Sequence, residues 1–139
     1  MRLRYDGRRI SAGGFLVSEV PENVNQVVSF CHDAAVRSGW WNDPETGEKL
    51  DRNIGELLAL IHSEISEALE GYRKGKMDDH LPDRTSFEVE LADAVIRIFD
   101  LSGHLNLDLG GAIYEKVLYN QTRSDHTHAA RKAPGGKRF

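Results

Sequence analysis

Four acidic residues in two short motifs are the part of this sequence best suited to chemistry. Glu64 and Glu67 form an E-x-x-E motif, and Glu90 and Asp93 form an E-x-x-D motif further along the chain. Residues three apart on a helix lie about 60° apart around its axis, so each motif points two carboxylates in nearly the same direction. If the two helices pack antiparallel, four carboxylates meet, and their repulsion requires a positive partner. Mg²⁺ and Mn²⁺ prefer oxygen ligands and are the expected partners.

Both motifs lie in stretches with helical periodicity. The first stretch begins at Asp51, a good N-cap residue, and reaches about residue 74. The second is capped by Thr85 or Ser86 and ends near Ser102. It is apolar on most of its surface, and its polar stripe consists of Glu90, Asp93, Arg97 and Asp100. Because a helix that is apolar on several sides must be buried on several sides, we expect this stripe to be enclosed.

Two further helices flank this pair in the sequence. One begins at Pro21 or Glu22 and ends near Gly39, and the other begins at Leu107 or Asp108 and reaches about residue 123. Together the four helices predict an all-α fold, a four-helix bundle.

The predicted bundle spans residues 21–125. Residues 1–20 are basic and contain a Gly-Gly pair, which predicts an N-terminal arm. Residues 126–139 end in P-G-G-K-R-F, which is typical of a flexible C-terminal tail.

Composition narrows the class of protein. A chain of 139 residues fits one domain, and its net charge of −4 argues against a dedicated nucleic-acid binder. We find no apolar run long enough to span a membrane and no signal peptide, so no membrane partner is expected. The single cysteine, Cys31, cannot form an intramolecular disulfide, which favours a reducing cytoplasmic location. Its apolar neighbours indicate a buried structural position on the first helix.

Three motifs in order resemble those of the all-α NTP pyrophosphohydrolases, the MazG-like superfamily. This superfamily includes dimeric dUTP pyrophosphatases and small dCTP-cleaving enzymes. The sequence I-H-S-E-I-S-E-A-L-E at residues 61–70 is followed by E-V-E-L-A-D-A-V at residues 88–95. A third segment, K-V-L-Y-N-Q-T-R at residues 116–123, resembles the later K-x-x-x-N-x-x-R element. The resemblance covers roughly residues 23 to 125.

The resemblance implies magnesium-dependent hydrolysis of a nucleoside triphosphate to the monophosphate and pyrophosphate. The implied metal ligands are Glu64, Glu67, Glu90 and Asp93. The implied phosphate-binding residues are Lys116, Asn120 and Arg123. One of the four carboxylates or Glu70 would accept the proton from the attacking water, and we favour Glu67. A homodimer or homotetramer is implied as well, and the second apolar side of the third helix also favours such an assembly.

The nucleotide base is expected between the first helix, or the loop that follows it, and the metal site. The candidate base-binding residues are Asn25, Trp40, Trp41 and Asn42. A loop with two tryptophans and an asparagine offers stacking and hydrogen bonds, which favours a purine such as that of dGTP. The alternative is a pyrimidine-specific enzyme for dUTP or dCTP.

Several simpler interpretations remain open. Acidic residues three apart often form a solvated helix face, so the chain could be a non-enzymatic interaction module with an acidic surface. A di-iron bundle is disfavoured, because neither acidic motif contains the expected E-x-x-H. Trp40 and Trp41 could form a hydrophobic plug or a dimer contact. Arg97 could neutralise Asp93 or Asp100, or it could contact a phosphate.

Overall fold

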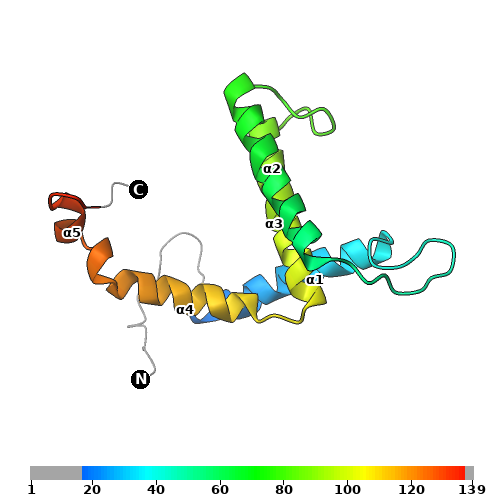
Figure 1. Cartoon of the computed structure of the whole chain (residues 1–139), viewed down its shortest axis with the longest axis horizontal. Helices are drawn as coiled ribbons and strands as arrows, with labels where there is room; N and C mark the ends of the chain where they lie inside the picture. Colours follow the sequence, from blue (N-terminus) through cyan, green and yellow to red (C-terminus); the bar gives the residue numbers. More distant parts are fainter. Residues whose placement is uncertain (1–16, 137–139) are drawn as a thin grey trace. The chain divides into compact units, whose positions relative to one another are not determined.

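The computed structural model describes residues 17–136, and within them the chain is helical. The only β-type pairings among these residues are two isolated bridges, Asn42 with Lys49 and Met77 with Thr85. The predicted all-α class is therefore confirmed. In chain order the elements in Figure 1 are η1 (Val17–Glu19), α1 (Val20–Arg37), α2 (Ile54–Lys74), α3 (Ser86–His104), α4 (Leu109–Thr122), η2 (Ser124–His126) and α5 (His128–Lys132).

None of the helices in the described part of the chain is both long enough and apolar enough to cross a membrane.

The chain divides into two units. Residues 26–107 form the first unit, which contains most of α1 and all of α2 and α3. The described residues of the second unit are 17–25 and 108–136, which include the start of α1 and the whole of α4.

Helices α2 and α3 form an antiparallel pair joined by residues 75–85 (Figure 1). The side chain of Asn53 caps α2 by accepting a hydrogen bond from the amide of Glu56, so the cap lies two residues after the predicted cap Asp51. Gly75 ends α2 in the left-handed conformation, with φ of 60°. Thr85 caps α3 as predicted, because its side chain accepts from the amide of Glu88.

Small residues allow α2 and α3 to approach closely. Ala68 on α2 and Ala94 on α3 are both buried. A Cβ atom on Gly71 would lie 2.8 Å from Oγ of Ser86, a distance that a real side chain does not tolerate. The close contact between the helices therefore depends on residues that have little or no side chain.

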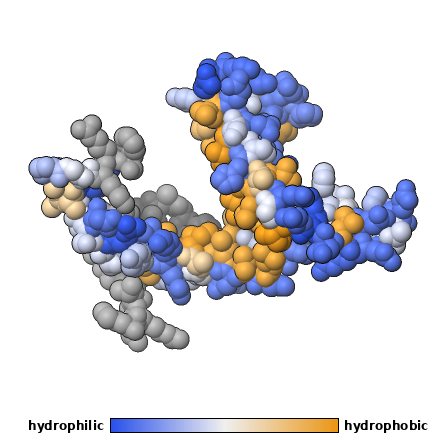
Figure 2. All heavy atoms as spheres, viewed as in Figure 1, coloured by the Kyte–Doolittle hydropathy of each residue, from blue (hydrophilic) through white to orange (hydrophobic). Residues whose placement is uncertain are grey.

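Large apolar side chains are exposed on the outer faces of this pair, and Figure 2 shows apolar surface along it. On α3 the exposed fractions are 39% for Phe87, 39% for Leu91 and 45% for Val95. Within a single chain α3 is therefore less buried than its apolar composition predicts. The physical reason is that α2 is its one extensive helical neighbour.

In the second unit, Asn25 connects the start of α1 to α4. Its amide nitrogen donates to Oδ1 of Asp108 at 2.7 Å, and its amide oxygen accepts from the backbone of Gly110 at 2.8 Å. Asp108 in turn caps α4.

The two predicted terminal segments are only partly described. In the predicted arm, η1 occupies Val17–Glu19 and α1 begins at Val20, whereas residues 1–16 lie outside the described part of the chain. In the segment predicted as a flexible tail, α5 occupies His128–Lys132, and residues 137–139 are not described.

Candidate metal centre

Three of the four predicted carboxylates meet between α2 and α3. Glu64 on α2 and Glu90 and Asp93 on α3 each offer one oxygen, and these oxygens all lie within 4.8 Å of one another. Glu64 is buried, with 6% of its surface exposed, whereas Glu90 and Asp93 are half-buried. We call these three residues the carboxylate cluster.

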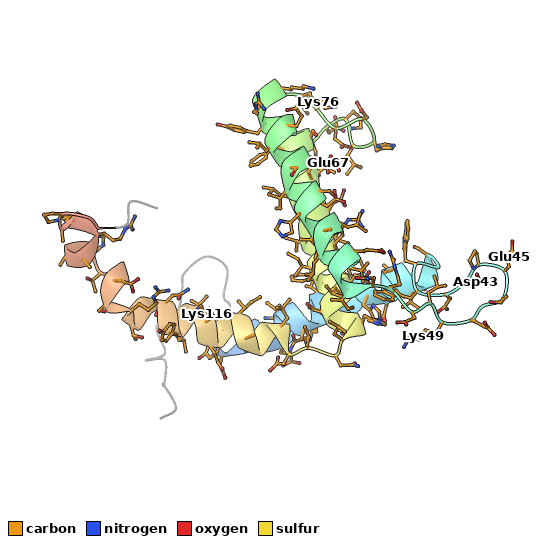
Figure 3. All side chains as sticks on the ribbon, in the orientation of Figure 1. Asp43, Glu45, Lys49, Glu67, Lys76 and Lys116 are labelled. Carbon is orange, nitrogen blue, oxygen red and sulfur yellow. The ribbon has the colours of Figure 1, made fainter. Side chains whose placement is uncertain are left out.

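The remaining acidic candidates lie outside this cluster. Glu67 is exposed on α2 (Figure 3), although its charge still acts on Glu90. Glu70 forms an ion pair with Lys74 at 2.7 Å on the same helix. The roles of Glu67 as a fourth ligand and of Glu67 or Glu70 as proton acceptor therefore stay predictions.

The carboxylate cluster is electrostatically unfavourable when all its members are ionised. Burial and then the charges of Glu67 and Glu64 raise the pKa of Glu90 above its ordinary value. Burial and then the charge of Glu64 raise the pKa of Asp93, and the positive charge of Arg97 partly opposes this effect. Both raised pKa values mean that ionising these carboxyl groups costs free energy, and a nearby cation would reduce that cost.

The donor set fits a hard divalent cation. Mg²⁺ holds oxygen ligands at about 2.1 Å, so ligands on opposite sides of the ion are about 4.2 Å apart. The cluster oxygens lie within 4.8 Å of one another, so small side-chain rotations would bring each pair within that maximum. Three carboxylates without sulfur or imidazole favour Mg²⁺ or Mn²⁺ over softer metals.

A positive charge already contacts the cluster. Arg97 lies four residues after Asp93 on α3, and its Nε atom donates to Oε1 of Glu64 at 2.5 Å. Arg97 therefore pairs with Glu64 on the neighbouring helix and does not act only on the acidic residues of its own helix.

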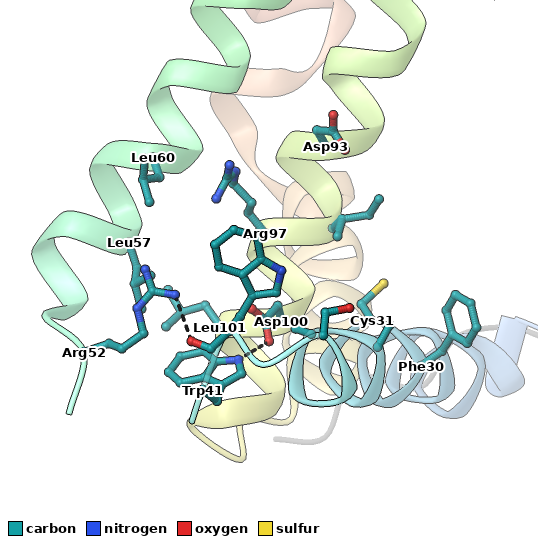
Figure 4. Close-up of a pocket in the computed structure, with 15 residues that line it drawn as sticks. Phe30, Cys31, Trp41, Arg52, Leu57, Leu60, Asp93, Arg97, Asp100 and Leu101 are labelled. Carbon is teal, nitrogen blue, oxygen red and sulfur yellow. Dashed lines mark hydrogen bonds between the residues drawn. The ribbon is translucent and has the colours of Figure 1, made fainter. Parts of the chain in front are cut away.

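A cavity of about 560 Å³ adjoins the cluster within the first unit (Figure 4). Asp93 and Arg97 belong to both the cavity wall and the cluster region, so the two are continuous. The volume lies in the range of small-molecule sites. Other residues of the wall are Phe30, Cys31, Trp40, Trp41, Arg52 and Asp100.

The two tryptophans of the cavity wall have different environments. Trp41 has 2% of its surface exposed, and its Nε1 atom donates to Oδ1 of Asp100 at 2.8 Å. Its ring stacks on His104 with 3.8 Å between centroids and 10° between planes. Trp40 is 63% exposed. Trp41 is therefore a fixed part of the wall, whereas Trp40 presents an accessible ring.

Asp100 organises this end of the cavity. It accepts from Trp41, and its Oδ1 atom also lies 2.8 Å from Nδ1 of His32 on α1. Arg52 adds a positive charge 5.7 Å from the Trp41 ring centroid. His32, His104 and Arg52 were not among the residues predicted for the site. The sequence did contain a signal for such residues. Asp100 continues the acidic stripe, and an enclosed carboxylate requires hydrogen-bond donors from neighbouring elements.

The other candidate base-binding residues are less directly placed. Asn42 forms an isolated bridge with Lys49, and it is not among the described residues that line the cavity. Asn25 belongs to the second unit, where both ends of its amide are hydrogen-bonded to the start of α4.

The predicted phosphate-binding residues lie on α4 or at its end, in the second unit. The ammonium group of Lys116 (Figure 3) lies 4.9 Å from the Tyr119 ring centroid, and Arg123 pairs with Asp125 at 2.6 Å. The Oδ1 atom of Asn120 is buried and has no hydrogen-bond partner within residues 17–136. The role of Lys116, Asn120 and Arg123 in binding phosphates at the carboxylate cluster stays a prediction.

Comparisons of the chain with models of known protein families, with curated proteins and with solved structures found no match.

Proposed function

We propose that this chain is a divalent-metal-dependent nucleoside triphosphate pyrophosphohydrolase. The observation that best supports the proposal is the convergence of Glu64, Glu90 and Asp93 beside a nucleoside-sized cavity. These residues come from the two motifs, and in the order, that resemble the MazG-like superfamily.

The chemistry required is cleavage of the anhydride bond between the α- and β-phosphates. A water oxygen bonds to phosphorus, pyrophosphate leaves, and the water proton passes to a base. Glu64, Glu90 and Asp93 would hold Mg²⁺ or Mn²⁺, with Glu67 as a further ligand. When bound, the ion would supply charge neutralisation to the phosphate oxygens and acidity to the attacking water.

The chain's own residues supply the rest. Glu67 is solvent-exposed beside Glu90, where it can accept a proton and release it to water. Lys116, Asn120 and Arg123 would hold the negatively charged phosphates and the leaving pyrophosphate.

The cavity would receive the nucleoside. Trp40 offers an exposed ring for stacking, and Arg52 offers hydrogen-bond donors to carbonyl acceptors. A volume of about 560 Å³ has room for a purine, and because a purine gains more from stacking on Trp40, we propose a purine nucleotide as the preferred substrate.

Assembly follows from the exposed apolar faces of α2 and α3. Phe87, Leu91 and Val95 on α3 and Ile65 and Leu69 on α2 are exposed in the single chain. A contiguous apolar surface of this kind is expected to be covered. We propose that a second copy of the chain covers it, giving a homodimer or a dimer of dimers in which four-helix packing completes the bundle.

Pyrophosphate release from a panel of dNTPs and NTPs, with and without Mg²⁺, tests the activity. Asp93→Asn should lower turnover by about 100-fold or more, because it removes a ligand charge. Glu88→Gln is the matched control on the same helix, since Glu88 is exposed and its ion pair within residues 17–136 is with Arg84. Its turnover should stay within about twofold of the unaltered chain.

Three outcomes would count against the proposal. Cleavage of no nucleotide, together with no metal-dependent rise in melting temperature, would favour the interaction module with an acidic face. Full activity of Asp93→Asn would remove the metal-site assignment. A clear preference for dUTP or dCTP would contradict the purine preference and leave the reaction itself intact.

A further inference from the structure

Arg97 is placed to interact with two different kinds of negative charge. Its Nε atom bonds Glu64, the most buried member of the carboxylate cluster, at 2.5 Å. The same side chain lines the 560 Å³ cavity. Among the described residues no hydrogen bond is made by its two Nη atoms, so the guanidinium retains donors for another ligand.

The ion pair involves a carboxylate that a metal would use. Oε1 of Glu64 accepts from Arg97, and Glu64 is also one of the three residues whose oxygens converge. A divalent cation at the cluster and the Arg97 guanidinium would therefore compete for the same carboxylate. Two positive groups that contact one carboxylate at close range also repel each other.

Because Arg97 lines the cavity, a ligand bound there is the expected partner when Arg97 leaves Glu64. The side chain of Arg97 is 44% exposed, whereas that of Glu64 is only 8% exposed, so the arginine has more room to move than the glutamate. An anion bound in the cavity next to a metal would offer phosphate oxygens. Guanidinium groups bind such oxygens well, because their planar fork donates two parallel hydrogen bonds.

We propose that Arg97 is a positioning residue that exchanges partners. It holds Glu64 in the metal-free chain and transfers to a phosphate group in the cavity when a divalent cation binds the cluster. The exchange rests on the proposed function, because it assumes that the cluster binds a metal. It makes metal binding and phosphate binding mutually supportive, since the metal replaces Arg97 as the partner of Glu64 and the phosphate replaces Glu64 as the partner of Arg97.

Metal affinity without nucleotide gives the first test. Calorimetric titration with Mn²⁺ at pH 8 would compare the unaltered chain with Arg97→Met, which keeps an unbranched, flexible side chain and removes its charge. The variant should bind Mn²⁺ about fivefold more tightly or better, the effect of one partly exposed ion pair. Arg84→Met is the matched control, because Arg84 forms an ion pair with Glu88, at 2.6 Å, and not with a member of the cluster. It should leave the affinity unchanged.

Phosphate affinity gives the second test. With Mn²⁺ saturating, Arg97→Met should bind inorganic pyrophosphate about fivefold more weakly or worse, whereas Arg84→Met should not change. Arg97→Lys retains the positive charge but lacks the planar fork of hydrogen-bond donors. It should restore the Mn²⁺ affinity of the unaltered chain and only part of the pyrophosphate affinity.

The outcomes separate this proposal from the proposed function. If the unaltered chain binds no Mn²⁺, both are wrong. If it binds Mn²⁺ and hydrolyses nucleotides, but Arg97→Met binds the metal equally or more weakly, the exchange alone is overturned. In that case Arg97 would be a fixed support for Glu64. Unchanged pyrophosphate affinity in Arg97→Met would overturn the transfer to phosphate in the same way.

Discussion

Trp41 and Trp40 are adjacent in the sequence, and the structure predicts opposite consequences when each is changed to phenylalanine. Trp41→Phe removes the indole Nε1 that donates to Asp100 at 2.8 Å. A hydrogen bond to a charged group contributes about 1.5–3 kcal/mol. The smaller ring also loses part of the stacking on His104, worth about 0.5–1 kcal/mol. We therefore expect the free energy of unfolding to fall by about 2–4 kcal/mol.

Trp40→Phe is the matched comparison, because the substitution is identical and the side chain is 63% exposed. The hydrogen bond that Arg52 donates to this residue uses the backbone carbonyl, which the substitution retains. We expect the free energy of unfolding to change by less than about 0.5 kcal/mol. If Trp40 stacks on the base, its variant should instead raise KM for nucleotides with little change in kcat.

Urea unfolding followed by far-UV circular dichroism would measure both variants at one protein concentration, since self-association changes apparent stability. Equal losses of stability in the two variants would refute the distinction between a fixed wall and an accessible ring. A Trp41→Phe chain as stable as the unaltered one, but with weakened nucleotide binding, would show that Trp41 contacts the base and does not anchor Asp100.

Two further predictions concern pH and assembly. The raised pKa values of Glu90 and Asp93 mean that the folded, metal-free chain binds protons more readily than the unfolded chain. The contribution of these two groups to stability should therefore rise as pH falls from 8 toward about 4, and the rise in melting temperature caused by Mn²⁺ should be larger at pH 8 than at pH 5.5. A rise that is larger at pH 5.5 would contradict the assignment of the cluster. Val95→Glu places a charge on the exposed apolar face of α3 and should shift the chain toward monomer in sedimentation equilibrium. A monomeric unaltered chain at micromolar concentration would refute the assembly.

The helices were predictable because their signals are local. Thr85 caps α3 as its sequence context indicates, and Gly75 ends α2 in the left-handed conformation that favours glycine. The predicted cap of α2, Asp51, was wrong by two residues, because Asn53 is an equally good capping residue. Only the observed backbone shows that the Asn53 side chain reaches the amide three residues later.

The carboxylate cluster was predictable in part for a different reason. Helical spacing places Glu64 and Glu67 about 60° apart, so both face roughly the same way. Which of the two points into the contact with α3 depends on how the helices cross, and the periodicity of one helix does not contain that information. The close approach at Ala68 and Gly71 turns the Glu64 side of α2 toward α3 and leaves Glu67 exposed.

The polar stripe of α3 connects the two parts of the candidate site. Going along the helix, Glu90 and Asp93 face the cluster, Arg97 bonds the carboxylate of the opposite helix, and Asp100 anchors Trp41. Positions 93, 97 and 100 also line one cavity. Because these residues are three or four apart, a single helix face orders an end with carboxylates, a positive charge and a buried aromatic wall. A nucleoside triphosphate has the same order of parts, with its phosphates at one end and its base at the other.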